Sequence, residues 1–127
     1  MKKVLIIVFS LCLSHLSCSQ TSKQIGIQKF KVEIQRLNDS SAIYFDKGIK
    51  LLKAGENKEE IAKILKPKLR YYEIQIDSLV RNFYNKARKL KLTEAEYNAV
   101  FEELKKKINS NLEKYKFLSE NGVNITN

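Results

Sequence analysis

Residues 86–104, KARKLKLTEAEYNAVFEEL, contain the boundary that decides how this chain folds. Thr93 and Glu96 have the spacing of a capping box, in which the threonine hydroxyl accepts from the backbone N–H of Glu96 and the glutamate carboxylate reaches back to the backbone N–H of Thr93. Apolar residues spaced by three and four lead up to this boundary and continue after it. Because only about two residues separate the two patterns, we expect two long helices that run antiparallel as neighbours.

The helix after the boundary has one apolar face and ends at Asn121-Gly122, a typical C-terminal cap. This face consists of Tyr97, Phe101, Leu104, Ile108, Leu112, Tyr115 and Leu118. The helix before the boundary begins at Asn57, an N-cap residue with Glu60 three residues on. Its apolar stripe consists of Ile61, Leu65, Leu69, Tyr72, Ile76, Leu79, Phe83, Ala87 and Leu90. Pro67 lies within this stripe, and because the stripe stays in phase on both sides we expect a kink there, not a break.

A first helix is expected over residues 25–54, with Gly55 as its stop signal. The apolar positions are Ile27, Phe30, Ile34, Leu37, Tyr44, Phe45, Ile49 and Leu52, and their spacing is interrupted by a gap at Ser41. Residues 30–34 also alternate between apolar and polar side chains, which leaves a strand as the alternative for that stretch.

These patterns predict an all-α fold: an elongated antiparallel three-helix bundle with coiled-coil-like packing, forming a single domain over residues 25–127. Helices over residues 25–54, 57–90 and 94–120 would be on the order of 40 to 50 Å long, so they can pack side by side. A chain of this size can bury a core without disulfides or metals. Coiled-coil seams also leave homodimerisation open.

The first 24 residues have the composition of an export segment. Lys2 and Lys3 precede an apolar run of about ten residues, whereas spanning a bilayer takes roughly twenty. Ser17-Cys18-Ser19 then resembles the lipobox of bacterial lipoproteins, with His15 at the position of the usual leucine. The resemblance implies a signal peptide over residues 1–17, an acylated Cys18 that anchors the protein in a membrane, and a flexible tether over residues 18–24. The alternative is cleavage after Ser19, which would release a soluble protein.

Loss of residues 1–17 would remove a histidine and a cysteine, side chains that could serve as metal ligands or catalytic groups. His15 is the only histidine, and Cys12 and Cys18 are the only cysteines. The remaining chain would therefore have no Cys/His set for zinc, no disulfide pair and no nucleophile–histidine pair. We expect no enzyme activity, no metal and no cofactor.

The chain is strongly basic, with 24 Lys and Arg against 14 Asp and Glu, a net charge of +10. If the protein is exported, we expect no nucleic-acid partner, and the remaining partners are anionic components of the cell envelope, such as lipid head groups, or an exported protein. The best candidate for an anion-facing surface is the set Arg81, Lys86, Arg88, Lys89 and Lys91, which has only Glu94 and Glu96 nearby. The alternative is a solubilising role, since cations are favoured at a helix C-terminus in any case.

Together these expectations describe a small exported lipoprotein that faces the periplasm and acts as a non-catalytic helical binding or scaffold protein. The alternative is a soluble or anchored periplasmic chaperone, or an immunity or inhibitor-type protein, that holds one exported partner. Residues 92–96, LTEAE, resemble the Leu-Thr-x-x-Gln motif of the Spy family of periplasmic chaperones, with Glu96 in place of Gln. Tyr71, Tyr72 and Ile74 widen the apolar stripe, and either cover the edge of the core or form a groove for a partner helix.

Overall fold

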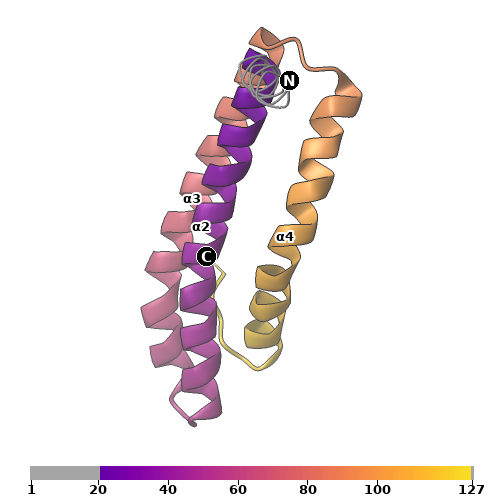
Figure 1. The fold of residues 1–127 in the computed structure, drawn as a ribbon. Coiled ribbons are helices and arrows are strands. Elements are labelled where there is room, and N and C mark those ends of the chain that lie inside the picture. Colours follow the sequence, from indigo (N-terminus) through magenta and orange to yellow (C-terminus); the bar gives the residue numbers. More distant parts are fainter. Residues whose placement is uncertain (1–20, 127) are drawn as a thin grey trace, which may run out of the picture.

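The computed structural model describes residues 21–126, and this part of the chain forms three helices and no strand (Figure 1). The helices are α2 (Ser22–Lys53), α3 (Lys58–Lys89) and α4 (Glu94–Glu120). Successive helices run in opposite directions, which confirms the predicted all-α antiparallel bundle. The alternative prediction of a strand over residues 30–34 is wrong, because these residues lie inside α2. Within residues 21–126 no helix is long and apolar enough to cross a membrane.

The first helix begins earlier than predicted. Thr21 is its N-cap, and the Thr21 hydroxyl accepts from the Gln24 backbone N–H at 3.2 Å. The Gln24 side chain in turn accepts from the Thr21 backbone N–H at 3.1 Å, which completes a capping box. The predicted tether over residues 18–24 is therefore wrong for residues 22–24, which are helical. The spacing Thr-x-x-Gln was the signal for this start, and residues 18–20 lie outside the described part of the chain.

The second helix begins as predicted, and it continues through Pro67 without interruption. At its start, the Asn57 side chain accepts from the backbone N–H groups of Glu59 at 2.8 Å and Glu60 at 3.3 Å. These bonds satisfy two of the four donors that the first turn of a helix leaves without a partner.

All three helices end in the same way, with one residue in the left-handed region that reverses the chain. This residue is Gly55 after α2 (φ 82°), Lys91 after α3 (φ 54°) and Gly122 after α4 (φ 85°). The backbone N–H that follows it bonds back to a carbonyl of the last turn, as in the 2.9 Å bond from Val123 to Leu118. Glycine adopts this conformation freely, whereas Lys91 carries a Cβ into it.

The bundle is not symmetric, because α2 packs along both α3 and α4 while the backbones of α3 and α4 rarely approach each other (Figure 1). The expectation that α3 and α4 are neighbours therefore holds only near the turn that joins them. There large aromatic side chains fill the space between them, with Phe83 lying 5.9 Å from Tyr97 and 6.2 Å from Phe101 between ring centroids.

The core is divided into two apolar clusters with a polar layer between them. The cluster near the α3–α4 turn contains Phe30 and Phe83, stacked with their ring centroids 4.0 Å apart, and is completed by Ile34, Val100 and Leu104. The other cluster consists of Ile61, Ala62, Leu65, Leu118, Val123 and Ile125. Val123 and Ile125 belong to the segment after α4, which folds back so that both are buried (Figure 1).

Candidate functional site

The five cations predicted to face an anion are all exposed. Arg81, Lys86, Arg88 and Lys89 lie on the last turns of α3, and Lys91 lies in the turn to α4. None of the five forms an ion pair with any of residues 21–126. We call Lys86, Arg88, Lys89 and Lys91 the basic end of the bundle. Arg81 lies about 10 Å further back along the helix, one heptad before Arg88 and on the same face.

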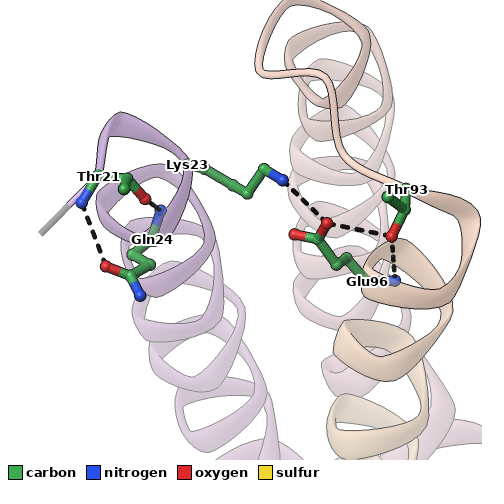
Figure 2. Close-up of polar contacts among 5 residues, drawn as sticks. All are labelled: Thr21, Lys23, Gln24, Thr93 and Glu96. Atoms are coloured by element: carbon green, nitrogen blue, oxygen red, sulfur yellow. Dashed lines mark hydrogen bonds and ion pairs between the residues drawn. The ribbon is translucent and has the colours of Figure 1, made fainter.

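The N-terminus of α2 lies at this same end of the bundle (Figure 1). Gly26 in the second turn of α2 packs so closely on Leu90 that a Cβ there would lie 2.7 Å from the Leu90 Cδ1 atom. In the first turn, the Lys23 ammonium donates to the Glu96 carboxylate at 2.9 Å and so joins α2 to α4 (Figure 2). The start of the first helix and the turn between the other two are thus held together.

Glu96 is bound differently from the predicted capping box. Its backbone N–H donates to the Thr93 hydroxyl at 3.1 Å, as expected (Figure 2). Its carboxylate, however, accepts mainly from Lys23 and from the Thr93 hydroxyl, and the Thr93 backbone N–H is a weaker partner. The hydrogen bond from Lys23 is the main cause that lowers the pKa of Glu96 below its ordinary value, although partial desolvation opposes it. Because Lys23 occupies this carboxylate, Glu94 is the one carboxylate of the first turn of α4 left to offset the basic end.

Two further side chains have shifted pKa values. The hydrogen bond from Lys31 on α2 lowers the pKa of Glu103 on α4, again against some desolvation. Burial raises the pKa of Tyr97, and the neighbouring Tyr84 adds to this. The two glutamates tie α2 to α4 by ion pairs, and neither is paired with a second carboxylate in the manner of an acid/base dyad.

The predicted lipidation site, Cys18, lies outside the described residues. The first described residue, Thr21, follows it by three positions. Among residues 21–126 no cluster of three or more His, Cys, Asp or Glu side chains could hold a metal ion.

A second candidate site lies halfway along the bundle, where three polar residues replace the apolar core. Asn38 and Ser41 of α2 and Asn111 of α4 are all buried. The two hydrogens of the Asn111 amide nitrogen are shared among three acceptors: the Asn38 backbone carbonyl at 2.8 Å, the Asn38 side-chain oxygen at 2.9 Å and the Ser41 hydroxyl at 3.0 Å. The Ser41 hydroxyl donates to the Asn38 carbonyl at 2.8 Å. This layer fixes the register of α4 on α2.

A cavity of about 260 Å³ opens beside the polar layer, between α3 and α4. Asn38, Ser41 and Asn111 line it together with apolar side chains of all three helices, and Glu73 and Asp77 of α3 line it as well. Leu112, predicted to belong to the core, lines this cavity and is 59% exposed, so that prediction is wrong. Aromatic pairs bridge α3 and α4 near the turn, whereas no aromatic pair of the described residues joins these two helices beside the cavity.

The sequence pattern did not identify this second site. The gap at Ser41 in the apolar spacing was its one signal, since Asn38 and Asn111 lie among other polar residues. Tyr71, Tyr72 and Ile74 do not line one groove, because only Tyr72 lines the cavity. Tyr71 packs edge-on against the Tyr72 ring, and both Tyr71 and Ile74 are about half exposed. No protein-family model, no curated protein and no solved structure matches the chain.

Proposed function

We propose that this protein is a lipid-anchored, non-catalytic helical binding protein of the bacterial cell envelope, attached through Cys18 and facing the periplasm. In this proposal the basic end of the bundle rests against the anionic surface of the membrane to which the protein is attached. The remaining length of the bundle then projects away from the membrane and is available to a partner.

The observation that carries the proposal is the shared location of the start of α2 and the basic end. Thr21 follows Cys18 by only three residues, and an extended chain spans at most about 3.5 Å per residue. An acyl anchor at Cys18 would therefore keep the first turn of α2 within roughly 10 Å of the head groups. Lys86, Arg88, Lys89 and Lys91 lie at that same end and form no ion pair with any residue that the structure describes.

The electrostatics of this end also favour an anionic surface. Each Lys or Arg close to an anionic bilayer contributes about 1 kcal/mol of attraction, which declines within a Debye length. The four cations of the basic end would together contribute up to about 4 kcal/mol. An acyl chain combined with a polybasic patch is a common two-part attachment, in which the charges also set the orientation.

The anchor is tested by expressing the full chain and its Cys18→Ser variant in a bacterium, followed by intact-mass measurement and membrane fractionation. We expect a mass increase of acyl size and membrane association that are both lost in the variant. An unmodified species in the soluble fraction would refute the anchor.

The role of the basic end is tested separately, with the signal-free chain starting at Thr21 and vesicles of phosphatidylglycerol and phosphatidylcholine. Replacement of Lys86, Arg88, Lys89 and Lys91 by Gln should reduce binding to the anionic vesicles by up to roughly a thousandfold, and added salt should have a similar effect. The matched control replaces four exposed, unpaired lysines remote from this end, namely Lys47, Lys53, Lys68 and Lys116. Equal losses in the two variants would show that net charge alone, and not the basic end, governs binding.

A second candidate function is that of a chaperone or an immunity or inhibitor-type protein that holds one exported partner. The cavity between α3 and α4 favours it, since this feature lies away from the basic end. Pull-down of one exported protein at stoichiometric ratio, lost on substitution of the cavity wall, would support this role.

A further inference from the structure

The polar layer leaves two hydrogen-bonding atoms without a partner. The Asn111 atom that lies 2.8 Å from the Asn38 backbone carbonyl must be its amide nitrogen, because a carbonyl can only accept. The Asn38 side-chain atom 2.9 Å from that nitrogen must then be its oxygen. This assignment leaves the Asn111 Oδ1 acceptor and the Asn38 Nδ2 donor without a partner among residues 21–126.

These two atoms are accessible although their residues are almost completely buried. Asn38 is 7% exposed and Asn111 is 6% exposed. In the described part of the chain, every side-chain nitrogen or oxygen that is sealed from solvent has a hydrogen-bond partner. The two unpaired atoms therefore retain accessible surface, and the cavity is the open space that both residues line. Two residues that line the cavity thus offer it one accessible hydrogen-bond acceptor and one accessible donor.

The walls of the cavity are apolar, and its charged rim is acidic. The apolar lining comprises Leu69, Tyr72, Ile76, Ile108, Leu112 and Tyr115. On the rim, Glu73 is paired with Arg70 at 2.8 Å, whereas Asp77 has no ion pair with any described residue. An acidic rim on a chain of net charge +10 is a local exception, and it favours an occupant that carries a positive charge.

We propose that this cavity binds a short, extended, apolar peptide segment that carries one basic side chain. A residue in extended conformation presents its N–H and C=O on the same side, as in a hydrogen-bonded pair of antiparallel strands. Its N–H donates to Asn111 Oδ1, and its C=O accepts from Asn38 Nδ2. Apolar side chains of the segment contact the walls, and its cation pairs with Asp77. The volume of about 260 Å³ lies just below the roughly 300–1,000 Å³ of typical ligand pockets, so the cavity takes only a short segment and excludes a whole helix.

This inference does not depend on the lipid anchor or on the basic end. The cavity lies in the middle of the bundle, and the signal-free chain contains all of its residues. Failure of the membrane experiments would therefore leave the peptide site untouched, and failure of the peptide experiment would leave the membrane proposal untouched.

The test is an NMR titration of the ¹⁵N-labelled chain starting at Thr21 with the probe peptide acetyl-Leu-Lys-Leu-amide at up to millimolar concentration. We expect shifts of the side-chain amide signals of Asn38 and Asn111 that saturate. In a second peptide, the N–H that donates to Asn111 Oδ1 is replaced by an ester oxygen. This change should weaken binding about five- to tenfold, as expected for the loss of one neutral hydrogen bond. Replacing the peptide lysine by glutamate should weaken it by a similar factor.

Matched protein variants distinguish binding in this cavity from nonspecific apolar association with the surface. Leu112→Lys adds a cation at the rim, removes apolar wall and should weaken binding at least tenfold. Ile43→Lys makes the same change at a residue of α2 that is 67% exposed and does not line the cavity, so it should have no effect. Both positions are exposed, so both variants should fold.

Three results would overturn the proposal. The first is a lack of shifts at the two asparagine side chains at millimolar peptide. The second is equal weakening by Leu112→Lys and Ile43→Lys. The third is an equally strong response to acetamide, which would assign the site to small carboxamides in place of peptides.

Discussion

Substitution of Gly48 by alanine tests the close packing of the three helices at one point. Gly48 is buried in α2, and a Cβ there would overlap the Leu65 Cδ1 atom and lie 3.4 Å from the Leu118 Cδ1 atom. Leu65 and Leu118 are both fully buried, so neither side chain has free space to move into. Overpacking a core costs about 1 to 3 kcal/mol, whereas the better helix propensity of alanine returns about 1 kcal/mol. We expect Gly48→Ala to lower the free energy of unfolding by up to about 2 kcal/mol.

The measurement is urea and thermal unfolding followed by far-UV circular dichroism. A loss of this size should lower the Tm by up to about 10 °C for a domain of this length. A double-mutant cycle with Leu65→Ala identifies the cause, because the truncated side chain removes the overlap. In that background Gly48→Ala should become stabilising by about 1 kcal/mol, which is the propensity gain alone.

The matched control is Gly26→Ala. Its Cβ would lie 2.7 Å from the Leu90 Cδ1 atom, but Leu90 is only half buried and caps the end of α3, so its side chain can rotate away. Gly26→Ala should therefore be neutral or stabilising. If Gly48→Ala itself stabilised the protein by about 1 kcal/mol, the core around Gly48 would accommodate a Cβ without cost. That result would refute our account of the contact with Leu65 and Leu118.

Three further predictions concern the end of the bundle where α2 begins. Thr93→Ala removes the N-cap of α4 and should cost about 1 kcal/mol in thermal unfolding, whereas Thr126→Ala should cost nothing; equal effects would contradict the capping role. Lys91→Gly should raise stability by about 1 kcal/mol, because glycine adopts φ 54° without strain, and Lys91→Ala should give no such gain; a gain from both would contradict strain at this residue. The pKa of Glu96 is lowered in the folded protein, so this carboxylate contributes stability above the pKa of the unfolded chain and loses it as pH falls through the folded pKa. Lys23→Gln should raise the pKa of Glu96 in an NMR titration, whereas Lys29→Gln should not; an unchanged pKa in Lys23→Gln would contradict the assigned cause.

Much of the fold could be predicted from the sequence, because helix boundaries are local. Asn57 and Thr93 start their helices, and Gly55 and Gly122 end theirs, through hydrogen bonds that span only a few residues. The start at Thr21 has an equally local signal in Thr21 and Gln24, but the polar residues around it are also typical of a tether.

The candidate sites depended more on tertiary structure. The exposure of the five cations followed from the sequence, because charged residues outside an apolar stripe lie on the surface. Their proximity to the start of α2 did not, because it requires the antiparallel order and matched lengths of all three helices. The polar layer was equally hidden, since Asn38 and Asn111 resemble surface residues until α2 and α4 are placed in register.

The sequence by itself determined that this chain forms three capped amphipathic helices, because propensity, capping and apolar spacing act over a few residues. Only the tertiary structure decided that α2 lies at the centre, that the basic end adjoins its first turn, and that a cavity opens between α3 and α4. These features depend on how side-chain volumes fill the space between helices, such as the stack of Phe30 on Phe83 and the contact at Gly48. The fit of side-chain volumes between segments that are distant in the sequence leaves no periodic pattern in that sequence. It is therefore determined only when the segments pack against each other.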